Sequence, residues 1–188
     1  LASGTFSVIV ADPPWTYGAS TPSSGYGSSD QHYACLTTDE ICALPVKERA
    51  TKDAVLFLWI PNPLLSDGLR VVDAWGFGYK TNIVWVKDKP TLGPLGVYVR
   101  GQHELLLIAT RGTFVPQTND RPVSVLTAAT RGHSVKPEEA YAIIKRMYPG
   151  QQYLELFARK PRPGWTVSGA EVERGAGLVN GTATRLQA

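Results

Sequence analysis

The residues Asp12-Pro13-Pro14-Trp15 bring together an acid, two prolines and an indole directly after an apolar run. Proline has a fixed φ and no backbone N–H, so the two prolines cannot extend a sheet and predict a stiff corner whose carbonyl groups lack regular partners. Such a corner suits a flat base with an exocyclic amine, because the amine can donate to the acid and a carbonyl while the ring stacks on the indole. An ordinary Asp-Pro turn beside a core tryptophan is the alternative interpretation.

Short apolar runs alternate with helical segments and predict the elements that would position this corner. Continuous apolar strands joined by helices indicate an α/β fold whose mostly parallel sheet is covered on both faces. We expect strands over residues 6–11, 54–60, 79–87, 104–110, 123–128 and 153–158, and helices over 37–44, 63–75 and 137–147. Because ligands bind outside the carboxyl ends of strands in such sheets, we expect the Asp12 corner, the loop after Ile60 and the loop after Thr110 to lie at that edge.

The bulk composition indicates an ordinary globular domain. The 188 residues fit one domain, which we expect to span 1–172 and to be followed by a loosely ordered tail over 173–188. A net charge of +3 permits an anionic partner without requiring one. No apolar stretch approaches the roughly 20 residues of a membrane span and no signal peptide is visible, so we expect no membrane association. Two cysteines are too few for a disulfide framework or a zinc site, which favours a reducing, cytoplasmic compartment.

The order of residues 12–15 resembles the signature of the MT-A70-like adenine-N6 methyltransferases, which use S-adenosylmethionine. Further stretches resemble the same family in the same order, at 56–65, 74–87, 96–112, 136–150, 153–165 and 168–172. The resemblance therefore extends from residue 6 to about residue 172. It implies a Rossmann-like methyltransferase fold with a permuted motif order, in which the catalytic tetrapeptide precedes the cofactor-binding strand. The compact form resembles prokaryotic or phage members of the family.

The resemblance also implies roles for individual residues. Asp12 and the Pro13 carbonyl would orient the adenine amine, Pro14 would shape the corner, and Trp15 would stack on the base. The implied cofactor-binding residues are Asp12, Lys136, Arg159, Arg162 and Glu171. From the residues alone, a solvated lysine at a helix start is an equal interpretation of Lys136. Glu155 is as readily a buried pairing residue, and His103 is expected to hydrogen-bond locally rather than to act in catalysis.

Two long loops, 16–33 and 88–102, interleave aromatic and basic side chains in a way that suits a strand of nucleic acid. An adenine in a duplex must be extruded before an enzyme can reach its amine, and these loops could close over it. The candidate nucleic-acid-binding residues are Tyr17, Tyr26, His32, Tyr33, Lys87, Lys89, Tyr98 and Arg100. The alternative is that these loops are merely solvated.

The sequence leaves several functions open. The compact, single-domain form favours DNA over RNA as the substrate. Relatives commonly carry asparagine where this chain has Ala170, which leaves room for a catalytically weak, nucleic-acid-binding relative that acts as a subunit. A methyltransferase for amines of small molecules or proteins is a third class. A homodimer or a partner subunit is implied only by analogy with the family.

Overall fold

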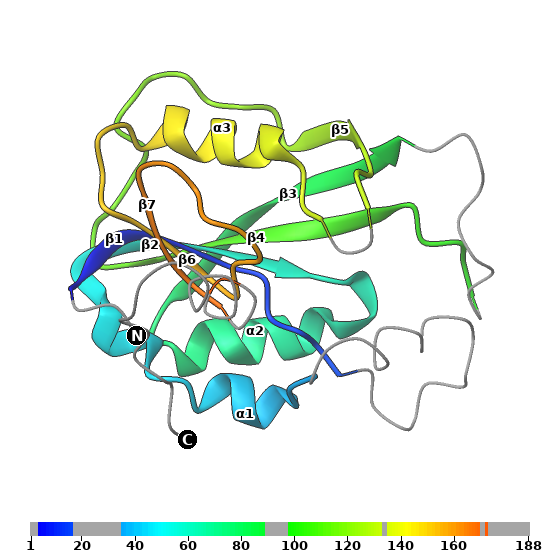
Figure 1. Ribbon diagram of the computed structural model, residues 1–188, viewed down its shortest axis with the longest axis horizontal. Coiled ribbons are helices and arrows are strands. Elements are labelled where there is room, and N and C mark those ends of the chain that lie inside the picture. The colour runs from blue at the N-terminus through cyan, green and yellow to red at the C-terminus, as the bar shows by residue number, and fades with distance from the viewer. Residues whose placement is uncertain (1–3, 17–34, 89–97, 133–134, 170–171, 173–188) are drawn as a thin grey trace.

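A computed structural model of the chain describes residues 4–16, 35–88, 98–132, 135–169 and 172 (Figure 1). Its strands form one seven-stranded sheet in the order β5-β3-β4-β2-β1-β6-β7. The strands are β1 (Phe6–Ala11), β2 (Ala50–Ile60), β3 (Gly78–Asp88), β4 (His103–Arg111), β5 (Val125–Ala129), β6 (Tyr153–Leu156) and β7 (Trp165–Ser168). The helices are α1 (Thr38–Cys42), α2 (Leu65–Ala74) and α3 (Glu138–Met147), with 3₁₀ turns at Val46–Arg49 and Asn62–Leu64. The predicted tail over 173–188 lies outside the described residues.

The sheet is mostly parallel, as the sequence predicts, but it contains one reversed strand. β1 runs parallel to β2 and β6, β6 runs parallel to β7, and β3 runs parallel to β5. β4 lies between β2 and β3 and is antiparallel to both. The prediction that the loop after Thr110 joins the carboxyl edge is therefore wrong, because this end of β4 lies at the opposite edge. The start of β4, with His103 and Glu104, occupies the carboxyl edge instead.

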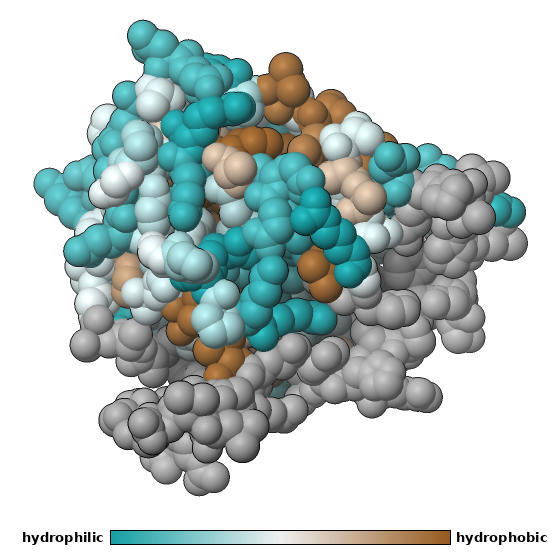
Figure 2. All heavy atoms as spheres, turned by 45° about the horizontal axis from the view of Figure 1, so that its top comes forward, coloured by the Kyte–Doolittle hydropathy of each residue, from teal (hydrophilic) through white to brown (hydrophobic). Residues whose placement is uncertain are grey.

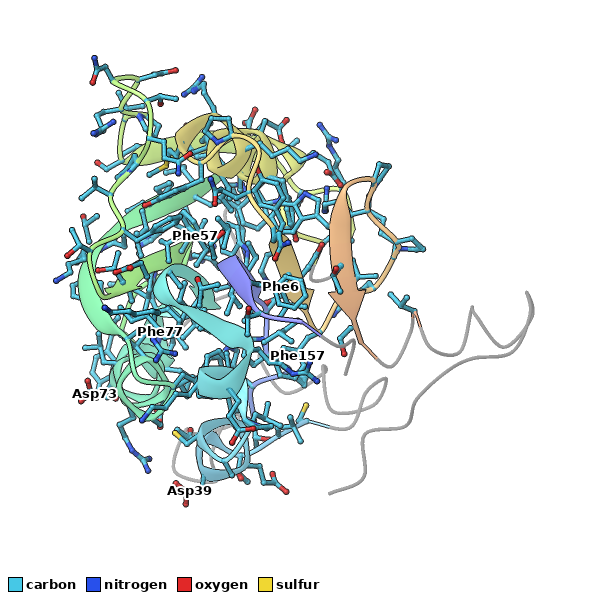
Figure 3. The ribbon with its side chains drawn as sticks, turned by 90° about the vertical axis from the view of Figure 1, so that its left-hand side faces the viewer. Phe6, Asp39, Phe57, Asp73, Phe77 and Phe157 are labelled. Carbon is cyan, nitrogen blue, oxygen red and sulfur yellow. The ribbon has the colours of Figure 1, made fainter. Side chains whose placement is uncertain are left out.

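Helices lie on both faces of the sheet, with α3 on one side and α1 and α2 on the other (Figure 1). Alternate side chains of β2 therefore enter two separate cores: Leu56 packs towards α1 and α2, and Phe57 packs towards α3. Figure 3 shows the same division, with Phe57 near α3 and with Phe77 and Phe157 on the opposite side. Burial on both faces explains the continuous apolar runs of the central strands, since each fully buried aliphatic side chain contributes roughly 1.5–3 kcal/mol.

Local signals in the sequence account for the helix boundaries. Thr37 and Glu40 form the predicted capping box, in which Thr37 Oγ1 accepts from the Glu40 N–H and the Glu40 carboxylate accepts from the Thr37 N–H. α3 begins after Pro137 with two glutamates in its first turn, where the helix dipole favours negative charge. Figure 2 shows mainly hydrophilic side chains over α3 and a smaller hydrophobic group towards β5. Among the described residues, no helix has the length and apolar character needed to cross a membrane.

Candidate active site

The proline corner lies at the carboxyl end of β1, in the middle of the sheet. Ala11, the last residue of β1, pairs with Leu58 of β2 on one side and with Leu156 of β6 on the other. The chain then leaves the sheet at Asp12, because Pro13 and Pro14 supply no N–H for the ladder. The prediction of a corner at this edge is confirmed.

The carbonyl groups of the corner are more engaged than the sequence predicts. The Pro13 carbonyl accepts from the Trp15 N–H at 2.9 Å, and the Pro14 carbonyl accepts from the Leu36 N–H at 2.8 Å. The first bond lies within the corner, and the second attaches the corner to the segment before α1. A carbonyl oxygen has two lone pairs, so the Pro13 oxygen keeps the capacity to accept a second hydrogen.

Trp15 differs from the expected open stacking surface. Trp15 is only 6% exposed and belongs to the core on the α1 and α2 side of the sheet. The indole N–H donates to the Trp59 carbonyl at 3.1 Å, which ties the corner to the end of β2. In this conformation Trp15 fixes the position of Asp12 rather than presenting a free ring.

Four alternating charges extend from Asp12 across the carboxyl edge. Lys136 Nζ lies 2.9 Å from Asp12 Oδ1 and 3.1 Å from Glu104 Oε2, and the second Glu104 oxygen accepts from Lys87 Nζ. We call Asp12, Lys136, Glu104 and Lys87 the charge cluster. Their side chains are only 10–24% exposed, so solvent screens these contacts weakly.

Two tryptophans form an aromatic floor beneath the charge cluster. Lys136 Nζ lies 5.5 Å from the ring centre of Trp59, and Lys87 Nζ lies 5.4 Å from that of Trp85. The two indoles meet edge to face with their centres 5.9 Å apart. Ammonium groups over aromatic faces gain electrostatic attraction, which helps to hold both lysines in place. Lys136 is thus part of the site and not a solvated lysine at a helix start.

Burial and the neighbouring charges shift the ionisation of these groups. Burial raises the pKa of the Asp12 carboxyl above its ordinary value, although the Lys136 ammonium opposes this shift. For Glu104, the adjacent Lys136 and Lys87 outweigh burial and lower the pKa. The carboxylates of Asp12 and Glu104 likewise outweigh burial to raise the pKa of Lys136. Lys136 therefore stays cationic, while Asp12 is the carboxylate that gains a proton more readily.

Glu104 is the site residue that sequence reasoning did not find. It lies in the second position of β4, opposite Trp85 of β3, on the sheet face that carries α3. Its only signal is an acid at the start of the apolar run "ELLLIAT". His103, its neighbour, hydrogen-bonds to Asn62 through the ring nitrogen Nε2 at 2.8 Å, which confirms the predicted local role.

A strained backbone corner lies beside the charge cluster, where β6 ends. Phe157 has φ of 62°, a left-handed conformation that a bulky residue adopts only when its surroundings impose it. The next N–H, from Ala158, donates to the Ser168 carbonyl at 3.0 Å. A Cβ on Gly169 would lie 2.2 Å from the Ala158 oxygen, so only glycine allows this close approach. The corner directs the chain to Arg159, whose charge opposes the rise in the Asp12 pKa that burial causes.

Arg162, which the resemblance implies for the cofactor site, lies in a network of charged and aromatic side chains. Its guanidinium donates to Glu155 Oε2 at 3.0 Å, pairs with Glu138, and lies 3.4 Å from the ring centre of Tyr141. The Tyr141 hydroxyl donates to the other Glu155 oxygen at 2.6 Å. The arginine lowers the pKa of Glu138 to about 2. This network joins α3 to β6, and it confirms the pairing interpretation of Glu155.

Replacing Arg162 with alanine is expected to lower the free energy of unfolding by about 3 kcal/mol, because Glu155 would remain buried without its cation. For a chain of this size the loss corresponds to a decrease of roughly 6–12 °C in Tm, measurable by circular dichroism. Lys160→Ala is the matched control, since the Lys160 side chain is 62% exposed and contacts Glu138 from the surface. An unchanged Tm together with weaker donor binding would instead support the cofactor-binding role that the resemblance implies for Arg162.

The described structure includes only some of the predicted nucleic-acid-binding residues. Lys87 belongs to the charge cluster, and Tyr98 is 95% exposed, with Arg100 also at the surface. The other predicted residues lie outside the described residues: Tyr17, Tyr26, His32, Tyr33, Lys89 and the cofactor candidate Glu171. Within the described part of the chain, no group of three His, Cys, Asp or Glu side chains is arranged to hold a metal ion.

Comparison with known proteins identifies the family. A model of the MT-A70 family matches residues 6–171. The chain belongs to the MT-A70 family. It is 32% identical over 183 residues to the Type II methyltransferase M.MunI of a Mycoplasma species, a match that covers 89% of this chain and 78% of that protein.

Eukaryotic members of the MT-A70 family match as well, but over a smaller part of their length. The chain is 31% identical over 185 residues to an Arabidopsis thaliana N(6)-adenosine-methyltransferase MT-A70-like protein. It is 30% identical over 179 residues to the human N(6)-adenosine-methyltransferase catalytic subunit METTL3. These matches cover 94% and 90% of this chain but only 25% and 29% of the two relatives. The chain therefore spans about a quarter of the length of these relatives.

Methyltransferases of the MT-A70 family use S-adenosylmethionine, which supplies an electrophilic methyl group on a positively charged sulfur. The residues present fit this group. The carboxylates of Asp12 and Glu104 suit its sulfonium and amino charges, and the cations Lys136 and Arg159 suit its carboxylate. All four come from segments that meet at the carboxyl edge of the sheet, where α/β folds bind their ligands.

Proposed function

We propose that the chain is an S-adenosylmethionine-dependent methyltransferase that modifies the exocyclic N6 amine of adenine in DNA. The observation that carries the proposal is the placement of Asp12 on a rigid proline corner, 2.9 Å from Lys136, in a chain of the MT-A70 family. The DNA assignment rests on the similarity to M.MunI, because the match covers 78% of that methyltransferase. RNA is the alternative, which the similarity to the adenosine methyltransferases supports over a smaller share of their length.

The chemistry requires a positioned acceptor rather than a strong base. The N6 amine is a poor nucleophile because its lone pair is delocalised into the ring. Asp12 and the Pro13 carbonyl accept its two N–H groups and hold the nitrogen in line with the methyl carbon, a gain in geometry and electrostatics. The bound donor would supply the methyl group from its sulfonium and would leave as the neutral thioether, and the surplus proton would leave the amine for solvent.

The neighbouring residues keep that acceptor in position. Pro14 shapes the corner, and Trp15 anchors it through the hydrogen bond to Trp59. Lys136 keeps Asp12 ionised in a poorly solvated site, because its ammonium opposes the effect of burial on the Asp12 pKa. Tyr98 and Arg100 contact the nucleic-acid strand from the surface, where an exposed aromatic ring and a cation can bind bases and phosphates.

The test is a methyl-transfer assay with labelled S-adenosylmethionine and three matched substrates: duplex DNA, single-stranded DNA and RNA of the same sequence. We expect N6-methyladenine, identified by mass spectrometry of the digested product, and more of it in DNA than in RNA. Methylation of RNA alone would assign the chain to the alternative substrate. Absence of N6-methyladenine from all three would overturn the proposal.

Arg159→Ala is expected to weaken binding of S-adenosylmethionine about tenfold. Arg159 follows the strained corner at Phe157 and lies near enough to Asp12 to influence its charge, so its cation can interact with the anionic part of the donor. Isothermal titration calorimetry measures the change, which corresponds to about 1.4 kcal/mol. Unaltered donor affinity in this variant would place the donor elsewhere.

A further inference from the structure

Lys87 is the outermost member of the charge cluster. Its side chain is 24% exposed, against 10% for Lys136. Its backbone N–H donates to the Gln102 carbonyl at 2.8 Å, so it lies beside the exposed residues that precede β4. A phosphate group approaching this edge can therefore reach Lys87 Nζ before it reaches Lys136.

Each inner member of the charge cluster divides its contacts between two neighbours. The two Glu104 oxygens contact different lysines, Lys87 and Lys136. Lys136 Nζ in turn contacts Asp12 at 2.9 Å and Glu104 at 3.1 Å. A charge that loses one neighbour interacts more strongly with the other, because these groups are poorly screened. A change at Lys87 is therefore transmitted through Glu104 and Lys136 to Asp12.

The contact with Lys136 restrains Asp12. In the structure Asp12 Oδ1 accepts from Lys136 at 2.9 Å, which holds the carboxylate towards the ammonium and neutralises part of the charge that would attract the adenine amine. If Lys87 turned to a phosphate, Glu104 would lose one cation and bind Lys136 more strongly. Lys136 would then move towards Glu104, and the Asp12 oxygen would become available.

We propose that Lys87 is a positioning residue that couples the binding of a nucleic-acid phosphate to the release of Asp12 from Lys136. The inference rests on the proposed function and adds a device that selects polymer over free nucleoside. A nucleoside without a phosphate leaves the Lys87–Glu104 pair intact and meets a restrained Asp12. A strand of DNA or RNA draws Lys87 away from Glu104 and meets an Asp12 that Lys136 has released.

The experiment compares two substrates, adenosine and a single-stranded oligonucleotide that contains one adenine, in wild type and Lys87→Met. We expect methylation of adenosine to rise about fivefold in the variant, because Glu104 has permanently lost its contact with Lys87. A change of this size corresponds to the loss of one charge contact. With the oligonucleotide, KM should rise and kcat should stay near the wild-type value. A merely structural role would instead lower both rates together.

Two further variants sharpen the test. Lys87→Arg keeps a cation beside Glu104 and should retain the wild-type preference for the oligonucleotide. Glu104→Gln removes the competing carboxylate, so Lys136 binds Asp12 alone and turnover should fall with both substrates. Lys80→Met is the matched control, because Lys80 is exposed on β3 towards the opposite edge of the sheet and should change neither rate.

The outcomes separate this inference from the proposed function. An active wild type whose Lys87→Met variant loses activity equally on both substrates, or keeps the wild-type ratio, would overturn the coupling and leave the proposed function intact. A wild type that forms no N6-methyladenine on any nucleic acid would overturn both. If methylation of adenosine rises in Lys87→Met but not in Lys87→Arg, the result supports the coupling.

Discussion

Replacing Asp12 with alanine is expected to reduce kcat/KM for methyl transfer about 1,000-fold, because the variant loses the acceptor that holds the adenine amine in line. The fold should survive. Asp12 lies outside both cores and is partly exposed, and Lys136 would still be paired with Glu104. Single-turnover rates measure the effect on chemistry, and circular dichroism melts measure stability.

Asp12→Asn is the matched control for this prediction. Asparagine keeps a carbonyl acceptor of the same shape but carries no charge, so we expect a smaller loss of turnover, roughly 10- to 100-fold. The difference between the two variants then reports how much the charge contributes beyond the hydrogen bond. Turnover near the wild-type rate in the alanine variant would remove Asp12 from the catalytic site.

Local signals in the sequence were sufficient for most of the fold. The central strands are buried on both faces, so their continuous apolar runs identify them without any alternation. The capping box at Thr37 and Glu40 identifies the start of α1, and Pro137 with its two glutamates identifies the start of α3. β7 was missed because its four residues, "WTVS", mix polar and apolar types and pair only at the edge of the sheet.

The direction of β4 was beyond the reach of the sequence pattern. The run "ELLLIAT" is equally apolar whichever way the strand runs, and the long segment between β3 and β4 permits either direction. The reversal exchanges the two ends of the strand, so Glu104 enters the candidate site and the loop after Thr110 leaves it. One strand direction therefore accounts for both the missed acid and the wrong loop.

Pairing between distant charges was also inaccessible from one sequence. Arg162 is paired with Glu138 on α3 and with Glu155 on β6, 24 and 7 positions away. This choice depends on how α3 packs on the sheet, which no local signal encodes. Trp15 shows the same limit, since its indole N–H donates to the carbonyl of Trp59, 44 positions away.

Replacing Lys136 with methionine is expected to reduce turnover about 100-fold and to move the acid limb of the pH–rate profile to higher pH. Asp12 and Glu104 would then lack the cation between them, so burial and mutual repulsion would raise the Asp12 pKa further. Asp12 accepts the amine only when ionised. Activity therefore falls as pH decreases through the Asp12 pKa, and the variant loses activity at a higher pH than wild type.

The double variant Lys136→Met/Glu104→Gln distinguishes this electrostatic role from simple loss of packing. Removing the Glu104 charge removes the repulsion that raises the Asp12 pKa, so the acid limb should return towards that of wild type. Turnover should stay low, because the Lys136 cation suited to the carboxylate of the donor is still absent. Rates measured from pH 5 to 9 at saturating donor test both points. If Lys136→Met and wild type shared one acid limb, Lys136 would not control the ionisation of Asp12, and its place 2.9 Å from that carboxylate would require another explanation.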